Sequence, residues 1–270
     1  MLVLIALLLG CPAPRPAENP DGWYTPVDDL DVIEPIPFTD EPYNFGVTDG
    51  IGAFSDDIFP ADGTVFAEGE GYEPGSSCDA EETSDLPREI EGVATVYPRF
   101  YMKVDGCDRD TEEKYYGSFF IQDASGGMFV LGDSKLAQFE AGNKVKIRVR
   151  AVRTTFDFDM VYNFDIIDID RSITPIHYDV PVGPLGPDDH SKVMRVSGIV
   201  VGDTSTFGEF QILADDGTTY NAQIDQELSR RGTSYQKGTR IQVTGPVLYS
   251  YGIRAILVMS HGQVTVLGSD

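Results

Sequence analysis

Two short blocks of sequence recur in the second half of the chain, and this repeat constrains the fold most strongly. Residues 117–127 read GSFFIQDASGG, and residues 208–218 read GEFQILADDGT. Residues 139–147 and 235–243 share the pattern aromatic, x, x, Gly, polar, basic, β-branched, polar, β-branched. The offsets are 91 and 96 residues and the order of the blocks is kept, so the repeat unit has the size of a domain. The sequence therefore predicts a tandem duplication.

Both copies show the alternation of apolar and polar residues that is typical of β-strands joined by tight turns. In the first copy, residues 144–152 alternate basic and apolar side chains, and residues 118–131 form a predicted hairpin around the turn DASGG. The predicted strands are Gly92–Val104, Ser118–Gln122, Met128–Leu131, Lys144–Val152 and Val161–Ile169, then Val193–Val201, Phe210–Leu213, Thr218–Gln223, Arg240–Val247 and Ile253–Met259. Short helical pieces are predicted at Ser134–Gln138 and Gln226–Arg230, and His261–Leu267 is a candidate sixth strand of the second copy.

Five strands with a small helix between the third and fourth is the order of the OB-fold barrel. The run FFIQDASGGMFV at residues 119–130 resembles the second hairpin of OB-fold domains in secreted bacterial nucleases and surface lipoproteins. The resemblance covers residues 90–171 and implies an OB fold there. The second copy keeps the skeleton but has LADD at 213–216 where the first has QDAS.

The predicted fold class is all-β, with two tandem five-stranded OB-fold-like barrels after a disordered acidic N-terminal segment. The predicted division of the chain is a signal peptide at 1–10, an acidic disordered linker at 11–89, a first OB-fold-like domain at 90–174, a connector at 175–191 and a second OB-fold-like domain at 192–270.

The first eleven residues, MLVLIALLLGC, are uncharged and end at a cysteine. They are too short to span a bilayer, which takes about 20 apolar residues, but they fit the apolar core of a secretory signal. The ending Leu-Leu-Gly-Cys resembles the lipobox of bacterial lipoprotein signals, which implies that Cys11 becomes the lipidated first residue. The implied location is the bacterial cell envelope, with a lipid anchor in the outer membrane. The alternative is a buried apolar N-terminal strand or helix.

Most of the net charge of −24 lies in the N-terminal segment. Residues 12–89 hold 20 acidic and two basic residues, whereas residues 90–270 hold 24 acidic and 18 basic residues. The N-terminal segment is also rich in Pro and Gly, which predicts a solvated, self-repelling linker. Such a charge argues against tight nonspecific nucleic-acid binding, which depends on neutralising phosphates with Lys and Arg.

If Cys11 is lipidated, Cys78 and Cys107 remain as a pair. In an oxidising compartment such a pair most simply forms one disulfide, and we predict Cys78–Cys107. A zinc site is the poorer interpretation, because the chain has no CxxC motif and no nearby His.

A row of basic side chains at Lys144, Lys146, Arg148 and Arg150 is the candidate face for an anionic ligand. OB-folds bind single strands with basic grooves and stacked aromatic side chains, and several aromatic residues lie nearby in the sequence. The alternative is a solvated strand face whose cations pair with carboxylates on a neighbouring strand. The candidate carboxylates are Asp157, Asp159, Asp165, Asp168 and Asp170.

No catalytic constellation can be nominated. His177, His190 and His261 are scattered, and the sequence has no HExxH, GxSxG or Walker motif. The acidic loop at residues 105–113 does not match an EF-hand and is interpreted as a solvated loop. We therefore predict no metal, no cofactor and no enzymatic activity.

The leading functional prediction is a lipid-anchored cell-envelope binding or assembly protein with no evident catalytic site. Its predicted partners are the membrane, through the lipid on Cys11, and an unidentified envelope protein or glycan. One alternative is an accessory single-stranded nucleic-acid-binding OB module, and another is an enzyme with an unrecognised site.

Overall fold

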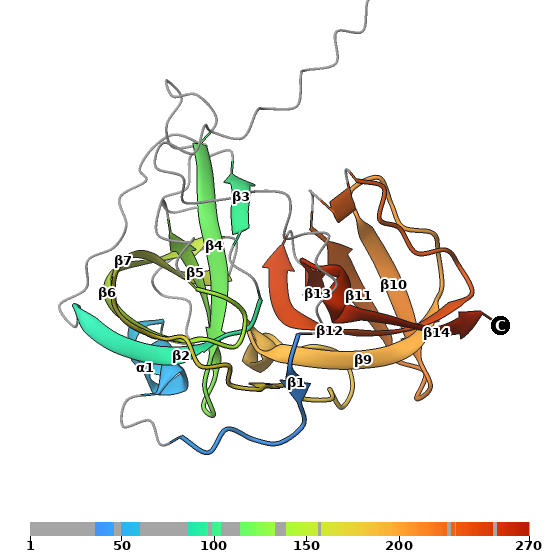
Figure 1. The fold of residues 1–270 in the computed structure, drawn as a ribbon. Helices are drawn as coiled ribbons and strands as arrows, with labels where there is room; N and C mark the ends of the chain where they lie inside the picture. The colour runs from blue at the N-terminus through green and yellow to red at the C-terminus, as the bar shows by residue number, and fades with distance from the viewer. Residues whose placement is uncertain are drawn as a thin grey trace, which may run out of the picture.

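The computed structural model describes residues 36–45, 50–59, 86–96, 99–103, 114–132, 139–155, 158–225, 228–229, 231–250 and 253–269. Strands dominate these residues (Figure 1). The elements in chain order are β1 (Phe38–Thr39), α1 (Ile51–Ile58), β2 (Arg88–Ala94), β3 (Arg99–Lys103), β4 (Lys114–Gln122), β5 (Gly127–Gly132), β6 (Lys144–Thr155), β7 (Phe158–Asp170), β8 (Ile176–His177), η3 (Pro187–Asp189), β9 (Val193–Val200), β10 (Glu209–Ala214), β11 (Thr219–Ile224), β12 (Thr239–Ser250), β13 (Ile253–Val258), η4 (His261–Gln263) and β14 (Val264–Ser269). Within the described part of the chain, no helix is long and apolar enough to cross a membrane.

The first sheet has six strands in the order β2-β6-β7-β5-β4-β3. β2 also pairs with β4 at Val93 and Ala94, so five of the strands close into a barrel. β5 and β7 run parallel, and the other pairs are antiparallel. This pairing is that of a five-stranded OB barrel, and the prediction of an all-β, OB-like fold is confirmed.

The second sheet has six strands in the order β13-β11-β10-β9-β12-β14, and β13 also pairs with β12. Its parallel pair is β11 with β13. In each sheet, five strands pair in a closed ring. When these five are numbered by their order along the chain, the first pairs with the fourth, the fourth with the fifth, the fifth with the third, the third with the second, and the second with the first. The predicted sixth strand is present as β14, and it begins at Val264 because His261–Gln263 forms the 3-10 turn η4.

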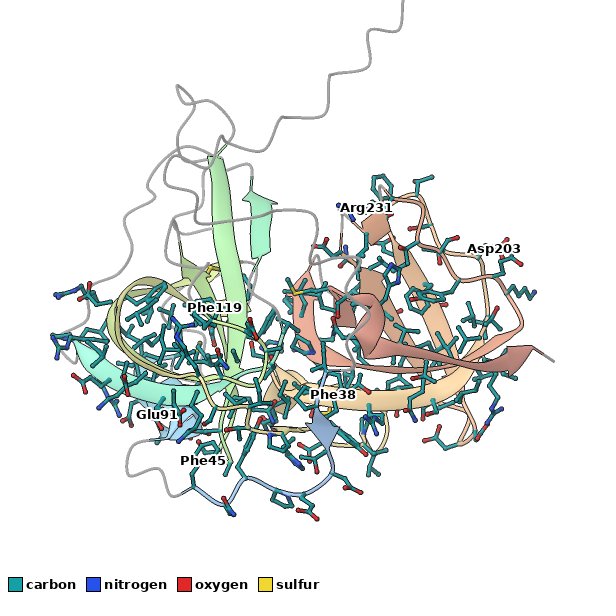
Figure 2. The ribbon with its side chains drawn as sticks, viewed as in Figure 1. Phe38, Phe45, Glu91, Phe119, Asp203 and Arg231 are labelled. Carbon is teal, nitrogen blue, oxygen red and sulfur yellow. The ribbon has the colours of Figure 1, made fainter. Side chains whose placement is uncertain are left out.

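Alternation along the strands sets the interior of each sheet. In β10, Phe210 and Ile212 are buried while Gln211 between them is exposed, as a period of two requires. In the first sheet, Phe119 lies among the side chains inside the barrel (Figure 2). It packs edge-on against Phe139 at 4.7 Å and against Phe164 at 5.8 Å between ring centroids. Such edge-to-face pairs add to the stabilisation from burial alone.

The predicted disordered linker at 11–89 is wrong for residues 36–45, 50–59 and 86–89, which belong to the fold. α1 lies beside β2 (Figure 1). It buries Ile51, Phe54 and Ile58 in the core of the first sheet. The spacing of three and four residues is that of an amphipathic helix, and it was missed because acidic residues and glycines surround it.

The turn between β4 and β5 holds the start of α1. The Asp123 carboxylate accepts the Ile51 N–H at 2.7 Å, and the Ser125 hydroxyl accepts the Gly52 N–H at 2.9 Å. These are backbone donors that the first turn of a helix leaves without intrahelical partners. The DASGG motif therefore serves as the helix cap as well as the hairpin turn.

Several predictions fall outside the described residues. The signal peptide at 1–10, the lipidation of Cys11 and the disulfide between Cys78 and Cys107 all lie there, so they stay predictions.

Candidate ligand-binding face

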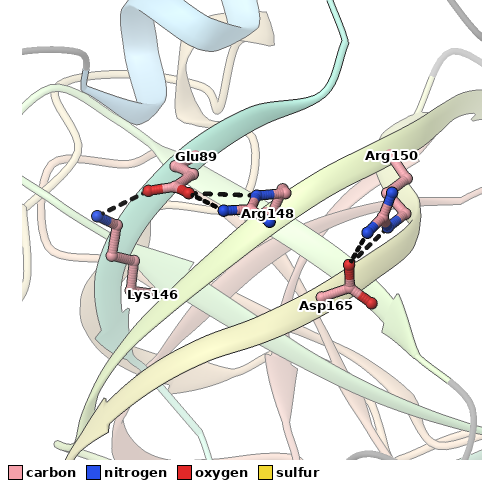
Figure 3. Close-up of polar contacts among 5 residues, drawn as sticks. All are labelled: Glu89, Lys146, Arg148, Arg150 and Asp165. Carbon is pink, nitrogen blue, oxygen red and sulfur yellow. Dashed lines mark hydrogen bonds and ion pairs between the residues drawn. The ribbon is translucent and has the colours of Figure 1, made fainter.

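The predicted basic row lies on β6, where it meets carboxylates of β2 (Figure 3). Glu89 accepts from Lys146 at 2.8 Å and from Arg148 at 2.7 Å. Lys144 lies 3.8 Å from the Glu91 carboxylate. Hydrogen bonds from Lys146 and then Arg148 hold the pKa of Glu89 below its usual value, and the bond to Glu89 raises the pKa of Lys146.

The fourth cation of the row pairs on the opposite side, where the Arg150 guanidinium lies 2.5 Å from the Asp165 carboxylate of β7. All four cations are thus engaged with carboxylates of adjacent strands, which is the alternative that the sequence left open. Asp165 was among its candidate partners. Glu89 had been assigned to the linker, and Glu91, in the predicted first domain, had not been considered as a partner. Cations already paired in this way add little attraction for a phosphate backbone.

A different surface is open in the second sheet. The outward side chains of β10 and β11 are exposed or half-buried, and the only charge among them is that of Glu209. Gln211 and Asn221 face each other across the two strands, and the Gln211 amide donates to the Asn221 oxygen at 3.0 Å. We call this surface the β10–β11 face, and it consists of Glu209, Gln211, Leu213, Thr219, Asn221 and Gln223.

An exposed aromatic side chain stands at one end of the β10–β11 face. Phe207, in the loop that leads into β10, is 77% exposed. The Ser205 hydroxyl accepts the N–H groups of Phe207 and Glu209, which fixes the loop. Gly208 has a φ of +83°, and a Cβ there would lie 2.7 Å from the Ile224 carbonyl oxygen, so glycine is required to place Phe207.

The equivalent cross-strand position in the first sheet is covered. Phe120 of β4 lies opposite Phe129 of β5. This pair is at the position in the first sheet that corresponds to Gln211 and Asn221 in the second. Their ring centroids are 4.9 Å apart, and both side chains are buried. The two sheets therefore present different chemistry at the same place: one has a buried aromatic pair and the other an exposed amide pair.

In the described part of the chain, the histidines do not form a cluster of their own with a residue of this face. His177 contacts Asp179 at 3.1 Å, and His190 accepts from Arg254 at 3.2 Å. Among the described residues, no group of three or more His, Cys, Asp or Glu side chains is placed to hold a metal ion.

Sequence reasoning missed Phe207, Gln211 and Asn221 because it searched for cations. The available signals were the period-two polar pattern of residues 209–213 and an aromatic residue directly before Gly208.

No protein-family model matches the chain, and no curated protein matches it. Three solved structures that resemble it are the p204 HINb domain, the Ifi202 HINa domain in complex with 20bp dsDNA, and a Replication Protein A heterotrimer bound to ssDNA. Their identities are 10%, 13% and 12%, and their TM-scores are 0.33, 0.31 and 0.32. The matches cover 67%, 68% and 76% of this chain and 97%, 97% and 52% of the other chains.

These structures correct the order of the functional predictions. The envelope binding or assembly role was placed first, with membrane, envelope protein or glycan as partners and nucleic acid as the less favoured choice. Two of the three resembling structures contain DNA, and the envelope role and its partners are withdrawn. Because the TM-scores are this low, the likeness by itself assigns no ligand, and a ligand has to be assigned from the chain's own surface.

Proposed function

We propose that this protein is a non-catalytic binding module of two tandem OB-fold domains, and that it binds single-stranded nucleic acid on the β10–β11 face. The observation that carries the proposal is the open, almost uncharged strand face with Phe207 at its end. OB-folds bind oligonucleotides on the face of their second and third strands and on the loop between the first and second. β10, β11 and the loop that holds Phe207 occupy those positions in the second sheet.

The shared pairing order of the two sheets supports the tandem arrangement. The repeated block at residues 117–127 starts in β4, and the block at 208–218 leads into β10. β4 and β10 are each the second strand, in chain order, of the five that pair in a ring in their sheet. The blocks at 139–147 and 235–243 lead into β6 and β12, which are each the fourth strand of that ring. A duplication with each domain folded as one barrel accounts for both observations.

The chemistry of the face suits bases better than phosphates. Exposed aromatic side chains stack on any base, and Asn and Gln amides can hydrogen-bond base edges. Residues 192–270 hold seven basic and seven acidic residues, so this half of the molecule does not repel a polyanion as the N-terminal segment does. With few cations to release counterions, binding should depend only weakly on salt.

Fluorescence anisotropy with a labelled single-stranded oligonucleotide of about 12 nucleotides, a length within the usual OB site size, tests the proposal. We expect binding at low salt, and about a tenfold loss for Phe207→Ala because stacking contributes about 1–3 kcal/mol per base. Val266→Ala, at an exposed position of β14, is the matched control and should bind as the wild type does.

The double variant Lys146→Glu, Arg148→Glu separates the two candidate faces. We expect it to leave binding unchanged, because both cations are already paired with Glu89. Loss of binding in this variant with full binding by Phe207→Ala would place the ligand on β6 instead. Absence of binding by the wild type at low salt would refute the proposed function.

A further inference from the structure

The aromatic pair Phe120 and Phe129 would be a stacking platform if it were open. Phe120 is 0% and Phe129 8% exposed, although both side chains point away from the core of their own barrel. Phe119 and Met128, their neighbours in the chain, fill that core instead. The outer face of β4 and β5 must therefore be covered by something other than the first sheet.

The second sheet supplies the cover. Leu257 of β13 and Met259 just beyond it are 6% and 2% exposed, and they pack in one cluster with Phe120, Phe129 and the first-sheet residues Val96 and Met160. In Figure 1, β12, β13 and one end of β9 lie on the side of the second sheet that is toward the first sheet. The place where an OB-fold would bind an oligonucleotide is occupied by apolar side chains of the same chain.

A buried glutamine fixes the covering side chains. The Gln263 carbonyl oxygen accepts the Met259 N–H at 2.7 Å, and its amide donates to the carbonyl of Leu257 at 2.8 Å and of Thr244 at 3.1 Å. Because Gln263 is only 2% exposed, these bonds are shielded from water. The segment that carries Leu257 and Met259 is thus held in one conformation.

A second buried glutamine ties the two sheets together beside this cluster. Gln122 of β4 accepts the Val193 N–H of β9 at 2.7 Å and donates to the His177 carbonyl of β8 at 3.2 Å. Gly127 of β5 approaches Ser191 so closely that a Cβ there would collide with the Ser191 carbonyl. Side-chain packing, buried hydrogen bonds and close backbone contact all join the same faces.

We infer that the β4–β5 face is permanently occupied by the second sheet of this chain, so that of the two equivalent strand faces among the described residues only β10–β11 is open to an oligonucleotide. The statement about the oligonucleotide rests on the proposed function, whereas the statement that the β4–β5 face is occupied does not. The first sheet then serves as the base that orients the second, and its own aromatic pair does not contact ligand.

Hydroxyl-radical footprinting of the full chain, read by mass spectrometry, tests the occupied face without any ligand. Phe129 and Met259 should be oxidised at least about tenfold more slowly than Phe207, as expected for side chains in a stably closed contact. Oxidation of Phe129 and Met259 at the rate of Phe207 would overturn the inference.

A variant pair tests the cover directly. Met259→Lys should increase the labelling of Phe129, because an unpaired ammonium group is strongly disfavoured in an apolar cluster. Val266→Lys, the same charge at an exposed position of the same sheet, should leave the labelling of Phe129 at the wild-type rate. If Met259→Lys fails to fold, the wild-type footprint decides the question alone.

Native mass spectrometry with a single-stranded oligonucleotide of about 12 nucleotides tests the number of faces. One oligonucleotide per chain at saturation is the expected result, and two per chain would overturn the single face. Absence of any complex would refute the proposed function instead, while the footprint would still decide whether the β4–β5 face is occupied.

Discussion

The β4–β5 hairpin of the first sheet and the β10–β11 hairpin of the second share a repeated sequence block and occupy the same place in their sheets. Their inward residues are alike: Phe119 and Ile121 correspond to Phe210 and Ile212, and all are buried. Their outward residues differ, since Phe120 corresponds to Gln211.

The same holds for the next outward position. Gln122 corresponds to Leu213 at the offset of 91 residues, but Gln122 is buried between the sheets whereas Leu213 is 39% exposed. The difference teaches that a strand face has two separate requirements. The inward side packs into the core of its own sheet in both hairpins, and the outward side faces either another part of the chain or solvent.

Truncation of Phe120 and of Gln211, the equivalent outward residues, should give the largest difference in the free energy of unfolding. Phe120→Ala should lower the free energy of unfolding by about 3–5 kcal/mol, as for other buried aromatic side chains. Gln211→Ala should change it by less than about 0.5 kcal/mol, because the side chain is exposed. Urea unfolding measures both, and equal costs would contradict the assignment of one face as covered and the other as open.

Substitutions in the two hairpin turns should differ by less in their effect on the free energy of unfolding. Asp123 accepts four hydrogen bonds, from Ile51, Ser125 (twice) and Gly126, so Asp123→Ala should cost about 3 kcal/mol and loosen α1. Asp216 accepts one exposed bond from Thr218, and Asp216→Ala should cost under about 1 kcal/mol. Hydrogen exchange at α1 distinguishes the two, since only the first variant should speed exchange there.

The next outward pair tests the contact between the sheets. Gln122→Met keeps the side-chain volume but leaves the buried Val193 N–H without its acceptor, which should cost about 2 kcal/mol in urea unfolding. Leu213→Met at the corresponding exposed position should cost almost nothing. A neutral Gln122→Met would show that the amide does not join the two sheets.

The smallest expected effect concerns the paired cations of β6. The pKa of Glu89 is lowered in the folded state by Lys146 and Arg148, so its contribution to stability is present above its unfolded pKa and is lost as the pH falls through the folded value. The Tm of Glu89→Gln should therefore be slightly below that of the wild type at pH 7. The difference should vanish once the pH lies below the lowered pKa of Glu89, where Glu89 is protonated in both states. A difference that persists at that pH would mean that Glu89 acts through packing.

Residue patterns were sufficient for the strands and their order. The alternation at Val145, Ile147 and Val149 predicts the strand and its inward side, since period two is a local property of an extended backbone. The strand boundaries were predicted less well. The run Gly92–Val104 was predicted as one strand, whereas the structure divides it between β2 and β3. α1 was missed because its three buried residues stand in an acidic, glycine-containing segment.

The site depended on contacts between residues far apart in the chain. Lys146 and Arg148 look like free cations until Glu89, 57 and 59 residues earlier, is placed beside them by the pairing of β2 with β6. Phe120 looks like a stacking residue until Leu257 and Met259 cover it. The repeated sequence by itself determined which residues of each hairpin point inward, because the alternation of side chains is a local property of an extended strand. The tertiary structure decided which outward face stays open, because that depends on which surfaces of the two sheets meet.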